Sequence, residues 1–227
     1  MHTTAQNNAR LFFETYVAVG SCLEIVDIGA QDVNGSLRPL CPAGARYTGV
    51  DLAPGKGVDL VLEDAYTLPF RDGSIDVILS SSCFEHCEMF WILFNEILRV
   101  LKPRGLFYLN VPSNGSFHRY PVDCWRFYPD SGKALVTWAR RSGFDPAVLE
   151  SYISYQQTDE WNDYVAVFVK DAALRHQFPH RILHRLKDFC NGFVDGQEEI
   201  INARPLPEDL MKLRFVADVL GGRVRVR

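Results

Sequence analysis

The segment EIVDIGAQDVNGSLRPLCPAGARYTGVDL, residues 24–52, constrains the fold of this chain most. Its first five residues, Glu24 to Ile28, are a short apolar run that leads into Gly29, as a buried parallel strand does when it enters a tight loop. A second short strand follows and carries Asp51 at its end, 22 residues after Gly29. A nucleotide-binding strand–helix–strand unit places a carboxylate at about this distance, ~20 residues, where it accepts hydrogen bonds from ribose hydroxyls. The segment therefore predicts the start of a parallel sheet that binds a ribose-containing ligand.

Four segments resemble, in order and spacing, the motifs of class I S-adenosylmethionine-dependent methyltransferases: VDIGAQDVNGS, GVDL, EDAYTLPF and LKPRGLFYLNVPS. The resemblance covers residues 23–170. It implies an α/β, Rossmann-like seven-stranded sheet with helices on both faces and S-adenosylmethionine as the cofactor. One departure stands in the first loop, because Gln31 and Val33 occupy the positions of the second and third glycines of the family pattern.

The resemblance also implies the residues that bind the cofactor. Asp51 accepts hydrogen bonds from the ribose, Asp64 receives the adenine amino group, and Ala65 makes a backbone contact. The alternative for Asp64 is a loop carboxylate that caps a turn. The full set of expected cofactor-binding residues is Asp27, Gly29, Gln31, Asp51, Leu52, Asp64, Ala65 and Ser81.

Length and composition favour a single domain over residues 1–227, and the resemblance implies that it is a methyltransferase domain. The chain has 47% hydrophobic residues and a net charge of −4, without the long basic stripe that a nucleic-acid substrate requires. The N-terminal region contains neither a cleavable signal nor a membrane-spanning run, so we expect a cytoplasmic protein without membrane partners. Six cysteines without a CxxC pair agree with a reducing compartment.

Helical patterns lie at both ends of the chain. Residues 1–22 contain an amphipathic helix, and residues 171–227 form a helical extension after the seventh strand. Within that extension we expect helices at 175–193, apart from Pro179, and at 208–220. The extension either folds back over its own domain or pairs with a second subunit as a homodimer.

The stretch from Pro112 to Pro129, PSNGSFHRYPVDCWRFYP, is too polar and too rich in proline for a helix or a central strand. Its aromatic residues predict a lid or a substrate wall, with Tyr120, Trp125 and Arg126 binding the acceptor. The stretch resembles an insert of small methyltransferase-11-like enzymes of sugar and surface-polysaccharide pathways. The resemblance implies methyl transfer to a small-molecule acceptor, and O-methylation of a sugar or a related polar metabolite in particular.

Methyl transfer from a sulfonium needs alignment of donor and acceptor and a group that removes the acceptor proton. His118 is the first candidate for this base, with Asp123 and His86 as alternatives. The other interpretations are that His118 only hydrogen-bonds the backbone and that Glu85 and His86 orient the methionine end of the donor. No metal ligand is assigned, because the sequence fixes no ligand spacing.

Two other functions remain open at this stage. A nicotinamide-dependent oxidoreductase also has an acid at the second strand, although its pyrophosphate requires the glycines that are missing here. The second alternative is an inactive, cofactor-binding subunit of a larger enzyme. A cofactor titration and an activity assay separate these readings.

Overall fold

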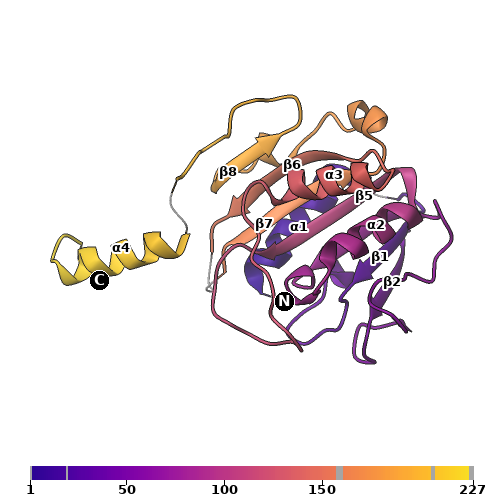
Figure 1. Cartoon of the computed structure of the whole chain (residues 1–227), viewed down its shortest axis with the longest axis horizontal. Coiled ribbons are helices and arrows are strands. Elements are labelled where there is room, and N and C mark those ends of the chain that lie inside the picture. Colours follow the sequence, from indigo (N-terminus) through magenta and orange to yellow (C-terminus); the bar gives the residue numbers. More distant parts are fainter. Residues whose placement is uncertain (1, 19, 157–160, 206–207, 225–227) are drawn as a thin grey trace.

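The computed structural model describes residues 2–18, 20–156, 161–205 and 208–224. Within these residues, eight strands form one mixed sheet in the order β3-β2-β1-β4-β5-β7-β6-β8 (Figure 1). The strand bounds are β1 Glu24–Ile28, β2 Arg46–Asp51, β3 Leu60–Val61, β4 Ile75–Ser81, β5 Leu101–Pro112, β6 Ala147–Ser154, β7 Asp163–Val169 and β8 Phe189–Val194.

Strands β1 to β5 are parallel, and β7 is inserted antiparallel between β5 and β6. The order of strands reverses between β1 and β4, which are direct neighbours: Asp27 lies opposite Leu79 in this pair. In an open α/β sheet, ligands bind outside the carboxyl ends of the strands at such a reversal. The topology therefore locates the candidate site at the ends of β1 and β4.

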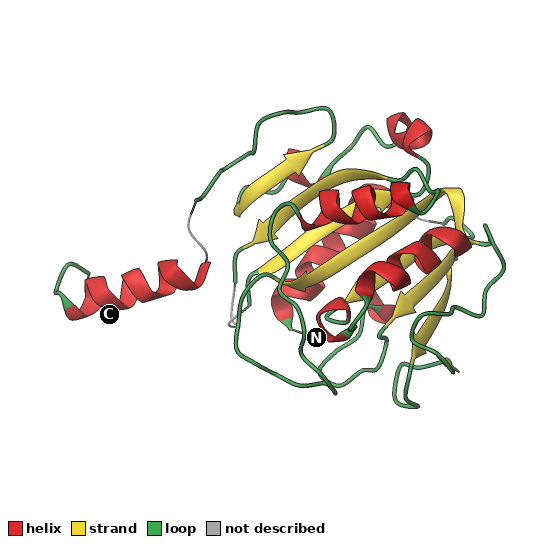
Figure 2. Ribbon diagram, viewed as in Figure 1, coloured by secondary structure: helices red, strands yellow, loops and turns green. Residues whose placement is uncertain are grey.

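Helices cover both faces of the sheet, as Figure 2 shows. One face packs against α2 (Phe90–Val100) and α3 (Ser131–Arg141), and alternate strand residues such as Val26 and Ile78 point toward it. The other face packs against α1 (Thr3–Tyr16), through residues such as Ile25 and Leu79. Because successive side chains of a strand point to opposite faces, both faces require apolar residues, which explains the nearly continuous apolar runs.

Short 3-10 helices lie in several of the connections between the strands and helices. They are η1 Arg38–Leu40, η2 Phe84–His86, η3 Ala172–Gln177 and η4 Ile182–His184. The helix in the connection after β1, η1, spans three residues, because Pro39 and Pro42 restrict the backbone there.

The sequence predicted seven strands and a wholly helical C-terminal extension, and both predictions were wrong in part. Residues 189–194 form β8, which pairs antiparallel with β6. A helix over 175–193 does not form because Pro179 lacks an amide hydrogen and the alternative, pairing with an open sheet edge, satisfies the backbone of Phe189–Val194. The helix predicted at residues 208–220 is present as α4 (Glu208–Leu220), and it extends away from the sheet in Figure 1.

Candidate active site

Five parallel strands bring their carboxyl ends to one edge of the sheet, and β7 begins at the same edge because it runs antiparallel to β5. Asp51 ends β2, Ser81 ends β4, and Asp163 at the start of β7 lies opposite Pro112. Polar side chains from distant parts of the sequence therefore meet along this edge.

Asp51 is held in place by the backbone of two loops. Its Oδ2 accepts a hydrogen bond from the amide of Gln31 (3.1 Å), and its Oδ1 accepts one from the amide of Ala53 (3.3 Å). A carboxylate has about four acceptor positions, so two such bonds leave capacity for a ligand diol. The side chain of Gln31 points elsewhere and donates to the carbonyl of Pro54 (3.3 Å).

Gly29 brings the loop after β1 against the loop after β4. It has a φ of +79°, and a Cβ built on it would lie 2.6 Å from the Cβ of Cys83. Both observations exclude a side chain at this position. Ser82 also has a positive φ, 52°, and turns the chain so that Cys83 faces Gly29. The single glycine retained from the family pattern is therefore required by contact with the chain itself.

Asp27 lies in the interior of the sheet. It is 3% exposed and accepts a hydrogen bond from the hydroxyl of Tyr47 on β2. Burial raises the pKa of Asp27 to about 7, against the lowering effects of the Tyr47 hydrogen bond and the nearby Arg38 guanidinium. These contacts give Asp27 a structural role, and its contact with the cofactor stays a prediction.

Three further residues expected to bind the cofactor lie after β2 and β3. Leu52 is 56% exposed, and Asp64 is exposed and accepts a hydrogen bond from the hydroxyl of Thr67 (2.7 Å). Ala65 is partly buried beside Asp64. The Asp64–Thr67 hydrogen bond joins two side chains, and it leaves the second carboxylate oxygen of Asp64 for a ligand.

The end of β4 carries polar side chains into the interior. Ser81 is 5% exposed and Glu85 is 1% exposed, and among the described residues neither Ser81 Oγ nor Glu85 Oε2 has a hydrogen-bond partner. Burial raises the pKa of Glu85 to about 8. A buried polar atom without a hydrogen-bond partner destabilises the fold. A molecule or ion bound beside these two atoms would relieve that cost.

The long loop after β5 is fixed by an ion pair. Arg126 donates two hydrogen bonds to Asp123, at 2.6 and 2.9 Å, and the amide of His118 donates a third at 2.8 Å. Because of the Arg126 hydrogen bonds, the pKa of Asp123 falls to about 2. A carboxylate of such low basicity is a poor general base, so Asp123 is better suited to positioning His118.

The loop also brings two imidazoles together. The ring centroids of His86 and His118 are 4.9 Å apart with an interplanar angle of 86°, and His118 contacts the ring of Trp161 at 4.8 Å. Nδ1 of His86 contacts the carbonyl of Val122, and Nδ1 of His118 contacts the carbonyl of Ser116 at 3.1 Å. Burial lowers the pKa of His86. One donor atom each from Glu85, His86 and His118 lie within 4.8 Å of one another.

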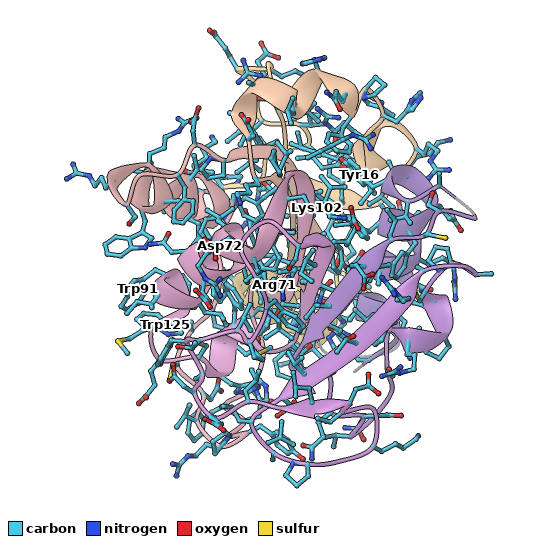
Figure 3. All side chains as sticks on the ribbon, turned by 90° about the vertical axis from the view of Figure 1, so that its right-hand side faces the viewer. Tyr16, Arg71, Asp72, Trp91, Lys102 and Trp125 are labelled. Carbon is cyan, nitrogen blue, oxygen red and sulfur yellow. The ribbon has the colours of Figure 1, made fainter. Side chains whose placement is uncertain are left out.

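Of the residues expected to bind the acceptor, Tyr120 is 55% exposed, whereas Trp125 is held in place. The indole of Trp125 donates to the carbonyl of Cys87 (3.1 Å), and its ring centroid is 5.9 Å from that of Trp91. Figure 3 shows the two tryptophans side by side. Arg126 is engaged with Asp123. The structure therefore leaves Tyr120 more available to an acceptor than Trp125 or Arg126.

A row of buried, hydrogen-bonded polar side chains at the same edge was not predicted from the sequence. Asn8 of α1 donates to Asn110 of β5 (3.0 Å), and Asn110 donates to Asp163 (2.9 Å). The signal was available in LFYLNVP, where Asn110 interrupts an apolar strand. Asn8 carried no such signal, because its polarity is ordinary for an N-terminal helix.

Within the described residues, none of the helices has both the length and the apolar character required to cross a membrane.

Residues 26–109, from β1 into β5, match the family described as a methyltransferase domain. A protein of Mycobacterium avium (strain 104) named as an uncharacterized methyltransferase is 40% identical over 113 residues, which cover 44% of this chain and 44% of that protein. A relative from Mycolicibacterium gilvum is matched over 29% of its length. The chain thus spans less than half the length of these curated relatives.

Solved structures extend the similarity to most of the sheet. The 1,6-didemethyltoxoflavin-N1-methyltransferase of Burkholderia thailandensis, with bound S-adenosylhomocysteine, has a TM-score of 0.55 at 17% identity, over 74% of this chain and 78% of that chain. Phosphoethanolamine N-methyltransferase 2 of Haemonchus contortus, in complex with S-adenosyl-L-methionine, has a TM-score of 0.51 at 16% identity, over 73% of this chain and 52% of that one. These two matches show the fold. The chain therefore has the α/β fold of S-adenosylmethionine-dependent methyltransferases, with an eight-stranded mixed sheet, and residues 26–109 are similar to their methyltransferase domain.

Proposed function

We propose that this protein transfers a methyl group from S-adenosylmethionine to a small-molecule acceptor. The observation that carries the proposal is Asp51, a carboxylate oriented by two backbone amides at the end of β2, next to the reversal of strand order. The match of residues 26–109 to a methyltransferase domain supports it.

The residues along the edge fit this cofactor. Asp51 retains acceptor positions for ribose hydroxyls, and the exposed side chain of Leu52 offers an apolar surface for adenine. Ser81 contributes a buried polar atom at the end of β4, where the methionine end would lie. When bound, S-adenosylmethionine supplies an electrophilic methyl group on a sulfonium, whose sulfur leaves as a neutral thioether without protonation. The chain has to bind it, orient the acceptor and hold the acceptor proton.

The imidazoles are suited to hold that proton. A carbonyl oxygen only accepts hydrogen bonds, so the Nδ1 atoms that contact Ser116 and Val122 carry hydrogen. In the neutral rings, Nε2 of His118 and of His86 then carries the lone pair. We propose His118 as the base, with Asp123 and Arg126 fixing its loop.

We propose a sugar or a related polar ring as the acceptor, with O-methylation as the reaction. Exposed aromatic side chains of the loop, including Tyr120 and Phe117, offer flat faces on which a sugar ring stacks. The neighbouring carbonyl and carboxylate groups offer acceptors to its hydroxyls.

Calorimetric titration with S-adenosylhomocysteine tests the proposed cofactor. Asp51→Ala removes a charged acceptor, so we expect a loss of roughly 1.5–3 kcal/mol in binding, about 10- to 150-fold in Kd. Asp188→Ala, which removes an exposed carboxylate beside β8, serves as the control and should bind normally. Equal affinity in the wild type and Asp51→Ala, or tighter binding of NAD, would overturn the proposal.

A further inference from the structure

We propose that Glu85, His86 and His118 form a binding site for a divalent transition-metal ion at the edge where the methyl acceptor is proposed to bind. No metal ligand was assigned from the sequence, because the sequence fixes no ligand spacing. The structure brings them together by folding the loop after β5 over the end of β4: the carbonyl of Glu85 accepts hydrogen bonds from the amides of Cys124 (2.8 Å) and Trp125 (3.2 Å).

The first argument is the distance between the donor atoms. One atom from each of the three residues lies within 4.8 Å of the other two, and Glu85 Oε1 is 3.7 Å from His86 Nε2. Metal–ligand bonds of about 2.1 Å hold neighbouring donors roughly 3–4 Å apart. Coordination at these distances would require the donors to approach one another by about 1 Å.

The second argument is the orientation of the imidazoles. Each Nδ1 contacts a backbone carbonyl. Nδ1 of His118 also lies 3.5 Å from Oδ2 of Asp123. This arrangement leaves the Nε2 lone pairs for coordination. Metal-binding histidines in general donate their other ring N–H to a carbonyl or a carboxylate, which fixes the ring and raises its basicity. Here the outer contacts of such a site are present for both rings.

The third argument is the buried carboxyl group, which is independent of the histidines. Glu85 is 1% exposed, and its Oε2 has no hydrogen-bond partner among the described residues. Removing a carboxyl group from water without a partner is unfavourable, and the nearby Asp163 and Asp123 add negative charge. A cation bound between Glu85 and the two imidazoles would give the buried carboxylate a partner and would balance the negative charge around it.

The ligand set indicates the class of ion. Two imidazoles and one carboxylate suit Zn²⁺, Fe²⁺ or Co²⁺, whereas Mg²⁺ and Ca²⁺ prefer oxygen ligands throughout. Cys83 and Cys87 are thiols close in sequence, but Cys83 packs against Gly29 and belongs to another contact. Three protein ligands leave at least one coordination position open.

The open position gives the site a role that rests on the proposed function. A hydroxyl oxygen of the acceptor bound there would lose its proton more readily, because the cation stabilises the alkoxide. The proton leaves to solvent, the oxygen forms a bond with the methyl carbon, and the carbon–sulfur bond breaks with its electron pair retained by sulfur. In the loaded protein His118 is then a ligand, and the free imidazole acts as a base only without the ion.

Titration of the chelator-treated protein with Co²⁺, followed by its visible absorption, tests the site without measuring turnover. We expect one ion per chain, and we expect His86→Ala, His118→Ala and Glu85→Gln each to weaken binding at least tenfold. His176→Ala removes an exposed histidine of η3 and should leave the spectrum unchanged. His118 is half-exposed, so its variant should fold even if the buried Glu85→Gln does not.

Titration of the same samples with S-adenosylhomocysteine separates this proposal from the proposed function. Cofactor binding that persists while Co²⁺ binds equally to wild type and His118→Ala would overturn the metal site alone. If the wild type binds Co²⁺ but does not bind S-adenosylhomocysteine, the methyltransferase proposal is overturned and the metal site is retained.

Discussion

Gly29, in the loop after β1, lies against Cys83 in the loop after β4, where the order of strands reverses. Its φ is +79°, and its missing side chain makes room for Cys83 Cβ, which would lie 2.6 Å from a Cβ at residue 29. Gly143, after α3, has a similar φ of +91° but no heavy atom within 4 Å of the corresponding position among the atoms compared. The two glycines thus share a backbone requirement and differ in packing.

We expect Gly29→Ala to destabilise the protein more than Gly143→Ala. The positive φ costs an alanine about 1–2 kcal/mol at either site, and overpacking against Cys83 adds about 1–3 kcal/mol at residue 29 alone. Urea denaturation of both variants measures the difference. Equal losses would mean that the loops separate without cost and that the contact with Cys83 does not define the site.

The sequence predicted that Gly29 and Asp51 lie at the ends of strands, and in the structure Gly29 directly follows β1 and Asp51 ends β2. This prediction was possible because each position depends only on the residues next to it in the sequence. The neighbours of His86 could not be obtained in the same way. His118 is 32 residues further along the chain, and it arrives beside His86 only because the loop hydrogen-bonds to the Glu85 carbonyl. Contacts of this kind depend on the path of a loop, for which sequence periodicity gives no information.

At the scale of elements, the loop from Ser113 to Asp130 is the segment that completes the candidate site. Its interior anchor is the Asp123–Arg126 pair, in which the Asp123 side chain is 1% exposed and Arg126 donates two hydrogen bonds. A guanidinium makes two parallel bonds to a carboxylate, and an ammonium cannot reproduce that geometry. The conformation of the loop therefore depends on arginine and not only on positive charge.

We expect Arg126→Lys to raise the KM for the acceptor severalfold and to change the affinity for S-adenosylhomocysteine less than twofold, because Asp51 and the loop after β1 are untouched. Arg140→Lys is the matched control, since Arg140 pairs with the exposed Asp145. An exposed pair contributes about 0–1 kcal/mol, so this control should behave as the wild type. Steady-state kinetics and calorimetry supply the two measurements, and an unchanged KM in Arg126→Lys would show that the loop does not shape the acceptor site.

Elements with strong periodicity were predicted closely. The first strand has the expected bounds, Glu24–Ile28, and the helix expected at 208–220 is present as α4, Glu208–Leu220. The eighth strand was missed because apolar residues between 175 and 193 also fit a helix, and only the open edge of β6 favours the strand. Tertiary pairing decided between two local solutions.

At the scale of the whole molecule, α4 is a helix that exposes a row of apolar side chains. Leu213, Val216 and Leu220 recur at helical spacing and are 65%, 51% and 83% exposed. In Figure 1 the helix extends away from the sheet. Apolar stripes of this kind are favourable when a partner covers them. We propose that a second copy of this chain is the partner, with the two α4 helices in contact.

A homodimer through α4 predicts that charge on the stripe separates the subunits. We expect the wild type to dimerise with increasing concentration and Leu213→Glu combined with Leu220→Glu to remain monomeric, because the pairing would bury two carboxylates beside their copies. Arg214→Gln changes an exposed residue of the same helix outside the stripe and should dimerise as the wild type does. Sedimentation equilibrium over a range of concentrations distinguishes the species. A wild type that stays monomeric throughout would mean that the helix folds back on its own domain, in which case the double variant should lose thermal stability instead.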